Sequence, residues 1–452
     1  MDNDLFNSLK QLALTVKRTV DDSTSKGVIK PEVEVFFRWK VDNFQYTDKG
    51  VTESRAHGEH ITKPSWFHAI IELEETVKNF NEYRVALERL TNVFGKSDMI
   101  PQALDDFVRR LVHKCLYDSK LNDNAIDVLI ETFLKDLREE PIKCGADVEL
   151  QGIVLRPDKI EPSFGITLRQ TRIEDLEKEV PEYGLAARDF LLRPSAIMTI
   201  DFLGRGGTEI QERVEEAITI LRLFKVGSVK WTRYHMRSES IIGIAGGTLT
   251  SGRTTGALET YLVAQEDVSK LKKFWQTMSN VIPENFIEFG ATKTDYLAIA
   301  YKRYGDALLE NGVLERRIAN AVMGLEALFL KPGELQELPY RLGVRIARLL
   351  GSLGYDPHEI RKIIGDAYGV RNLFAHGGQL SYERKKKLES KYKDVRNLLL
   401  SALDYLRILI IVMILSRKGK NEFIDLVDDS LVDKKREEIL NGVISNAKDI
   451  IG

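Results

Sequence analysis

Cysteine is scarce in this sequence: the 452 residues include two, Cys115 and Cys144. Two cysteines cannot build a disulfide framework, and neither belongs to a C-x-x-C pair of the kind that binds zinc or exchanges disulfides. Such sparing use of cysteine is typical of chains that stay in a reducing compartment. We therefore expect a cytoplasmic protein without structural disulfides.

Net charge is also nearly absent, because 66 Lys and Arg are balanced by 68 Asp and Glu. Hydrophobic residues make up 43% of the chain and charged residues 30%, which is the composition of a folded soluble protein. A chain with an overall charge of −2 has no global attraction for nucleic acid. Any phosphate-binding surface must therefore come from a local cluster of Arg and Lys.

Long hydrophobic runs are missing as well. The first residues, MDNDLFNSLK, have acidic groups where a secretion signal has basic ones, so we expect no signal peptide. Residues 398–415 are apolar enough to raise the question of a membrane span, but they include Asp404 and Arg407. Their uninterrupted apolar run, 408–415, has eight residues, and a span needs about 20. A buried core helix and no membrane partner are predicted.

The spacing of apolar residues predicts a multidomain α+β fold with three regions. Residues 1–140 form a mainly helical N-terminal region, in which 33–39 is a short β-like run followed by a polar loop up to residue 63. Residues 141–265 predict a small α+β domain. Its Gly-, Thr- and Ser-rich loop at 243–256 makes it a candidate sensor or recognition domain, since loops on a rigid scaffold commonly carry binding.

The expected elements of the α+β domain are strands at 148–155, 160–168, 195–202, 228–236 and 258–263 and a helix at 209–224. Residues 266–452 show helical periodicity throughout and predict a helix bundle. Its expected helices are 268–278, 294–309, 313–330, 338–353, 357–373 and 384–415.

Two segments contain residue types found in ligand sites, but their expected secondary structure or spacing does not fit such a site. Residues 247–254, GTLTSGRT, match a phosphate-binding loop except that Arg253 replaces the Lys, but a strand rather than a helix is expected to follow. A hairpin loop is the better interpretation. His57, His60 and His68 lie close in sequence, with Glu53 and Glu59 nearby, yet no zinc register is matched. We favour a solvated loop over a metal site and expect no cofactor.

The segment 369–378, GVRNLFAHGG, is the most informative one, because Arg371 and His376 stand together at the end of a predicted helix. Two upstream segments accompany it, 321–330 (AVMGLEALFL) and 338–350 (LPYRLGVRIARLL). In this order the three resemble the Apea-like branch of the HEPN superfamily, whose motif joins an Arg to a His a few residues later. The resemblance covers roughly 291–452 and implies a HEPN-type α-helical bundle and a metal-independent endoribonuclease.

The chemistry of these residues is consistent with that implication. Cleavage of RNA by its own 2′-hydroxyl needs a base, an acid and a positive group near the phosphorane. His376 supplies an imidazole, a side chain that commonly acts as a general base or acid. Arg371 offers a fixed fork of donors that Lys would match poorly. Asn372 lies four residues before His376, on the same helical face, where its amide would orient the imidazole or contact phosphate.

A single His cannot easily act as base and acid at once, and this chain has one such motif. The resemblance implies a pair of motifs, so we expect a homodimer with a composite Arg-x4-His site on its twofold axis. It also implies a regulated toxin or anti-phage defence effector, with a phage-derived or antitoxin regulator as a further partner. The alternative is a non-catalytic HEPN module for RNA or partner binding and dimerisation, in which His376 would be buried by packing.

Local charge supports a phosphate-binding surface. Between residues 341 and 371 six basic residues stand against three acidic ones, and the run 384–387 adds four more. The same cations could equally form a solvated helix face. Besides Arg371, the residues expected to bind RNA are Arg341, Arg345, Arg348, Arg361 and Lys362.

Overall fold

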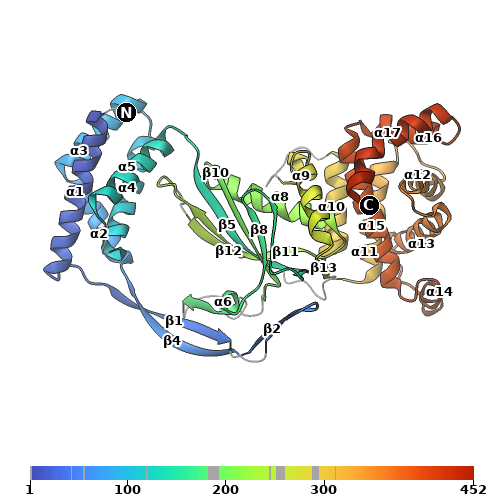
Figure 1. The fold of residues 1–452 in the computed structure, drawn as a ribbon, viewed down its shortest axis with the longest axis horizontal. Coiled ribbons are helices and arrows are strands. Elements are labelled where there is room, and N and C mark those ends of the chain that lie inside the picture. Colours follow the sequence, from blue (N-terminus) through green and yellow to red (C-terminus); the bar gives the residue numbers. More distant parts are fainter. Residues whose placement is uncertain are drawn as a thin grey trace. The chain divides into compact units, whose positions relative to one another are not determined.

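The structure, a computed structural model, shows a mixed α+β chain with a mostly helical C-terminal part, as predicted (Figure 1). It describes residues 3–41, 43–53, 56–118, 121–181, 193–243, 246–250, 260–287, 295–310 and 312–451. The chain forms two compact units. The first comprises Met1–Glu149, Thr171–Gln211 and Thr232–Thr250, and the second comprises Leu150–Gln170, Glu212–Trp231 and Ser251–Gly452.

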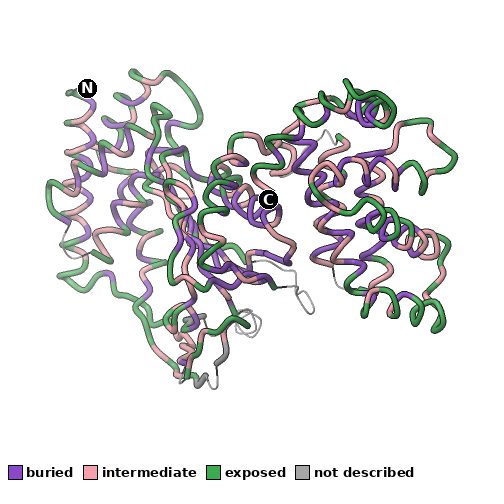
Figure 2. The backbone as a smooth tube through the Cα atoms, turned by 45° about the vertical axis from the view of Figure 1, so that its right-hand side comes forward, coloured by how far each residue is buried: buried purple, intermediate pink, exposed green. Residues whose placement is uncertain are grey.

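The first unit contains five helices that share one hydrophobic core. Figure 2 shows buried and exposed stretches alternating along them, which is the amphipathic pattern read from the sequence. Asn122 caps the fifth helix, as expected, by accepting a hydrogen bond of 2.9 Å from the amide of Ala125. The helices are α1 (Asn3–Ser25), α2 (Phe67–Lys78), α3 (Asn81–Phe94), α4 (Met99–Tyr117) and α5 (Asp123–Leu137).

A β-ribbon occupies the place of the expected polar loop between α1 and α2, so that expectation was wrong. Strands β1 (Glu32–Val41) and β4 (Ala56–Ser65) pair antiparallel over their full length, and β9 (Lys178–Pro181) extends the sheet. Gly58 leaves room for the Phe37 ring, because a Cβ there would lie 1.8 Å from it. Strands β2 (Phe44–Thr47) and β3 (Gly50–Glu53) form a second hairpin, and α6 spans Ile173–Leu176.

Four further strands of this unit lie in the order β12-β11-β5-β10. They are β5 (Ile142–Gln151), β10 (Ala196–Gly204), β11 (Lys230–Ser238) and β12 (Gly246–Thr250). Strand β12 lies inside the expected loop 243–256, of which 244–245 and 251–256 fall outside the described residues. The carboxylate of Asp136 on α5 accepts from the amides of Ile241 and Ile242, at 2.6 and 3.2 Å. The β11–β12 connection is thereby attached to the helices.

The second unit contains the helix bundle. Helices α14 (Tyr382–Tyr392) and α15 (Val395–Ser416) replace the single helix expected over 384–415, because Lys393 adopts a φ of 66° and Asp394 caps α15. The other helices are most of α8 (Thr208–Phe224), α9 (Asp267–Met278), η1 (Glu284–Phe286), α10 (Tyr296–Leu309), α11 (Leu314–Phe329), α12 (Leu338–Ser352), α13 (Pro357–Ala375), α16 (Lys420–Asp429) and α17 (Lys434–Ile451).

Its strands are short. The expected strand 160–168 is a hairpin of β7 (Lys159–Ser163) and β8 (Ile166–Gln170), and β6 (Ile153–Leu155) pairs parallel with β13 (Tyr261–Val263). From residue 266 onward the described part of the chain contains no strand, as predicted.

Side chains from β13, α10 and α15 cap the C-terminal end of α8, which lies in the second unit together with the bundle. The last four carbonyls of a helix have no partner within the helix. In α8 these are satisfied by the hydroxyls of Tyr261 and Tyr304, which donate to Leu221 and Arg222 at 3.0 and 2.9 Å, and by Arg407, which donates to Leu223 and Phe224 at 2.8 and 3.0 Å.

Helix α15 is the described helix that is long and apolar enough to cross a membrane, and 78% of its apolar window is buried inside the protein. Arg407 on this helix is buried and also bonds Asp404, at 2.7 Å. Its charge is satisfied by α8 and Asp404. These contacts match the interpretation of α15 as a core helix.

We predict that Arg407→Met destabilises the second unit by at least about 3 kcal/mol, because two buried carbonyls lose their donor and a carboxylate loses its counter-charge. Hydrogen exchange along a urea titration, read in peptides from α8 and α15, measures the effect. Arg436→Met is the matched control, since Arg436 is 52% exposed, and should stay within about 0.5 kcal/mol of wild type. Equal urea midpoints for the two variants would contradict the role given to Arg407.

Candidate functional site

Helix α13 ends at the motif in a regular Schellman turn. The amides of Gly377 and Gly378 donate to the carbonyls of Phe374 and Leu373, each at 2.9 Å. Gly377 has a φ of 75°, which favours glycine, and a Cβ on Gly378 would lie 2.7 Å from the Leu373 side chain. The two glycines therefore end the helix, as predicted, and His376 is its exposed C-cap residue.

The side chain of Arg371 is held in place by a residue of the neighbouring helix α11. Its Nη2 donates to Oε2 of Glu326 on α11 at 3.0 Å, and its Nη1 donates to Oδ1 of Asn372 at 3.3 Å. The guanidinium also lies over the Tyr368 ring, 5.6 Å from the centroid. Its Nε is buried and finds no hydrogen-bond partner among the described residues. The side chain is thus fixed in orientation by two of its five N–H donors, while Nε stays unused.

Glu326 is a site residue that the sequence analysis did not single out. Burial and then the nearby Glu326 carboxylate raise the pKa of Tyr368 to about 12. The phenol therefore stays protonated at neutral pH, and Glu326 lies between a neutral hydroxyl and the Arg371 guanidinium. A signal was present in the sequence, because Glu326 is the one charged residue in the apolar segment 321–330.

The structure brings the side chains of Arg371 and Asn372 together. The His376 amide donates to the Asn372 carbonyl at 3.2 Å, but neither of these two side chains hydrogen-bonds the His376 imidazole. Five helical positions separate Arg371 from His376 by about 140° around the axis, so the Arg faces α11 while the imidazole faces solvent. Asn372 is within about 40° of His376, on the expected face. Its amide oxygen bonds Arg371, so in this structure Asn372 orients the guanidinium and not the imidazole.

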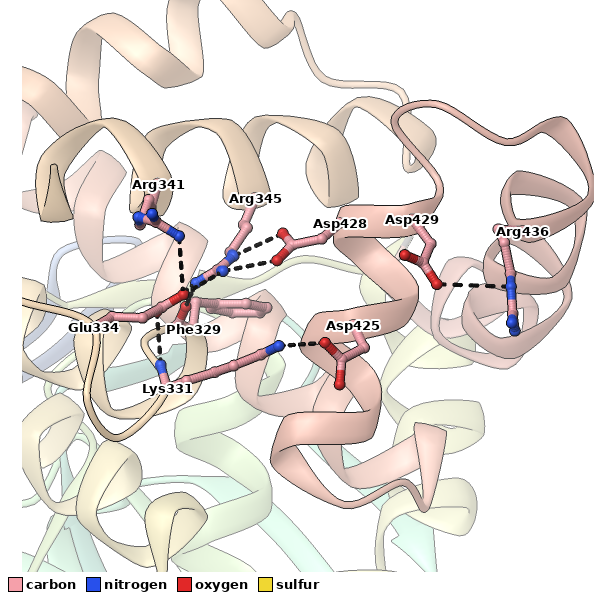
Figure 3. A network of polar contacts seen from close by, with 9 residues as sticks. All are labelled: Phe329, Lys331, Glu334, Arg341, Arg345, Asp425, Asp428, Asp429 and Arg436. Atoms are coloured by element: carbon pink, nitrogen blue, oxygen red, sulfur yellow. Dashed lines mark hydrogen bonds and ion pairs between the residues drawn. The ribbon is translucent and has the colours of Figure 1, made fainter. Parts of the chain in front are cut away.

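Arg345, expected at the RNA surface, is instead buried, with 3% of its surface exposed. All five of its N–H donors are used inside the bundle (Figure 3). Nε and Nη2 donate to the Asp428 carboxylate at 2.8 and 2.7 Å, Nη1 and Nη2 donate to Glu334 at 2.8 and 2.7 Å, and Nη1 donates to the Phe329 carbonyl at 2.8 Å. The RNA-binding assignment of Arg345 is therefore corrected, because no donor remains for a phosphate.

The other four predicted RNA-binding residues form two groups, one paired with carboxylates and one not. Arg348 and Arg341 pair with carboxylates, Arg348 with Glu437 at 2.9 Å and Arg341 with Glu334 at 3.3 Å. Arg361 lies over the exposed Tyr340 ring at 5.5 Å, and Lys362 is exposed. Arg348 and Arg361 also line a cavity of about 730 Å³ between α12, α13 and α17. The structure does not gather these four at His376.

The structure also describes parts of the two segments that contain ligand-type residues, the histidines near residue 60 and the stretch 247–254. His60 packs edge-on against Phe37, and His68 Nδ1 lies 2.8 Å from Glu32; the side chain of His57 lies outside the described residues. Among the residues that the structure describes, no three His, Cys, Asp or Glu side chains are grouped to hold a metal ion. Residues 247–250 belong to strand β12, while 251–254 are outside the described part.

Hydrogen bonding to Arg345 lowers the pKa of Glu334 from 4.5 to about 2. A carboxyl whose pKa is lower in the folded state stabilises the fold above its unfolded pKa. We predict that this contribution is complete above about pH 5 and is lost as the pH falls from 4.5 to about 2. The urea-midpoint difference between wild type and Glu334→Gln should shrink across that window. A constant difference would refute the linkage, and Glu383→Gln, on exposed α14, should show almost none.

Comparisons with protein-family models, with curated proteins and with solved structures found no match to this chain. The family resemblance accordingly stands on the three helical segments and the motif alone. The functional assignment rests on the side-chain geometry at the end of α13.

Proposed function

We propose that this protein is a metal-independent endoribonuclease that uses His376 and Arg371 to cleave RNA by attack of the 2′-hydroxyl. The observation that carries the proposal is an exposed imidazole at the end of α13, five residues after an Arg whose guanidinium is held by Glu326. A packed His376 would have favoured a scaffold. An exposed one is open to a polymer substrate.

Each side chain has a distinct part in the proposed reaction. His376 removes the proton from the 2′-hydroxyl or delivers one to the leaving 5′-oxygen, since imidazole exchanges protons near neutral pH. Arg371 stabilises the negative charge that develops on the phosphorane. Glu326 and Asn372 act through Arg371: they fix its planar fork before substrate arrives, which reduces the ordering that the reaction requires. The product is a 2′,3′-cyclic phosphate or the 3′-phosphate derived from it.

The proposal includes a homodimer. One His376 per chain supplies either base or acid, and a twofold axis near the ends of two α13 helices would add the partner's copy of the motif to one composite site. The HEPN resemblance further suggests a cytoplasmic toxin or anti-phage effector under a regulator. Residues 1–265 would then carry sensing or recognition.

A second function is favoured by one observation. Both Nη atoms of Arg371 already have protein partners, Glu326 and Asn372, as a structural Arg would. In that case the bundle is a non-catalytic dimerisation module that binds RNA or a protein partner. The cleavage assay separates the two.

We predict that the purified full chain cleaves total RNA or tRNA in EDTA. His376→Ala and Arg371→Ala should each lower the rate by about 10²- to 10⁴-fold, because a proton-transfer group or the phosphorane's counter-charge is lost. His358→Ala is the matched control, an exposed His at the other end of α13, and should keep wild-type activity. Activity only with added metal, or undiminished activity in either variant, would overturn the mechanism.

Glu326→Gln should lower kcat by roughly tenfold or more with little change in KM, because the amide keeps the shape of the side chain but holds the guanidinium less firmly. Glu326→Asp should restore part of kcat. Glu359→Gln, on the exposed side of α13, is the control for a general loss of negative charge. If Glu326→Gln matches this control in kcat, Glu326 does not position Arg371.

A further inference from the structure

Helix α14, which begins six residues after His376, carries a concentration of positive charge. Between residues 381 and 393 there are six Lys or Arg and two Glu, so the segment has a net charge of +4 in a chain of −2. Eleven residues of helix bury a single side chain, Leu388. The helix is therefore an exposed basic element next to the motif.

The inner side of α14 is attached to α13, the helix that carries Arg371 and His376. Arg384 donates to the Gly369 carbonyl at 3.2 Å, and a Cβ on Gly369 would lie 2.9 Å from the same guanidinium. Lys391 and Tyr392 both donate to Asp366, at 2.8 and 2.7 Å. Because Gly369 precedes His376 by seven residues, the two lie on the same face of α13. The attachment thus runs along the face that ends at His376.

The outer side of α14 has cations without partners. Lys386, Lys387 and Lys393 are exposed, with Lys387 at the flank of the helix next to Lys391, and none of them makes an ion pair with any described residue. Tyr382 is 79% exposed and lies four residues before Lys386, on the same helical face. On α12, by contrast, Arg341, Arg345 and Arg348 all pair with carboxylates. Free positive charge on this side of the bundle is therefore found on α14 and not on α12.

We propose that the outer face of α14 binds a single-stranded segment of the RNA substrate beside the scissile phosphate. Lys386, Lys387 and Lys393 contact backbone phosphates, and Tyr382 stacks on an unpaired base. Six residues extend at most about 22 Å, so Tyr382 lies within a few nucleotides of His376. A single strand fits better than a duplex, because a side chain can stack only on a base that is free of its neighbours. This inference rests on the proposed function for the identity of the substrate.

Binding can be measured without cleavage in the full chain carrying His376→Ala, by fluorescence anisotropy of a labelled single-stranded RNA oligonucleotide at several salt concentrations. Adding Lys386→Glu and Lys387→Glu should weaken binding by tenfold or more at low salt. It should also reduce the slope of log K against log salt by about 1 to 2, since each phosphate contact on a single strand contributes about 0.7. Tyr382→Ala should weaken binding by roughly tenfold with the slope unchanged.

The matched control is Lys434→Glu with Lys435→Glu, which reverses two exposed charges on α17. Both double variants change net charge equally, so general electrostatics cancels. Equal affinity and equal salt slope for the α14 and α17 variants would overturn the proposal, as would no RNA binding by the parent chain.

Cleavage by the otherwise wild-type protein separates this inference from the proposed function. Cleavage with a KM unaffected by the α14 substitutions leaves the nuclease standing and overturns the α14 surface. RNA binding that depends on α14, without cleavage by wild type, supports the surface and refutes the nuclease.

Discussion

The second unit depends on the burial of one guanidinium, that of Arg345. A buried charge is tolerated only when its donors are satisfied, and here two carboxylates and a carbonyl take all five N–H groups (Figure 3). The partners come from the end of α11, the loop before α12 and helix α16. One side chain therefore fixes how these segments meet. Helix α13 packs on both α11 and α12, so the position of the candidate site is set by the same interaction.

The planarity of the fork explains why Arg occupies this place. Asp428 and Glu334 each receive two parallel N–H bonds, an arrangement that a Lys ammonium cannot supply. At the candidate site a second Arg, Arg371, uses two Nη donors on Glu326 and Asn372 and keeps Nε free of described partners. The two arginines differ in how many of their N–H donors are used within the protein. Arg345 has no donor left for a further ligand, whereas Arg371 keeps unused donors that, in the proposed reaction, would bind a phosphate.

Local sequence was sufficient for some of these features. The helices of the bundle, the end of α13 at two glycines and the cap of α5 follow from periodicity and turn residues that act within a few positions. Local sequence was insufficient for strands β4 and β12, whose polar residues are stabilised by pairing with the strands β1 and β11. The break at Lys393 lies in a run with good helical character on both sides, where a positive φ leaves little trace in composition.

The candidate site was only partly predictable for the same reason. Arg371 and His376 are visible because they stand in one short segment. Whether Arg345 contacts RNA or is buried in an ion pair depends on Asp428, 83 residues away. A single sequence does not show which carboxylate pairs with a given cation. Glu326 likewise acquires its part only when α11 and α13 are side by side. Charge clusters in sequence therefore overstate a binding surface until their internal partners are known.

The capping of α8 joins residues that are synthesised far apart in time. The carbonyl of Leu223 emerges early, but the guanidinium that satisfies it, on Arg407, is added 184 residues later. A nascent chain therefore cannot complete this helix end until the ribosome has made α15, and by then the motif on α13 has already been translated. A chain that ends between residues 376 and 407 contains Arg371 and His376 but lacks the Arg407 contacts that complete the unit around them.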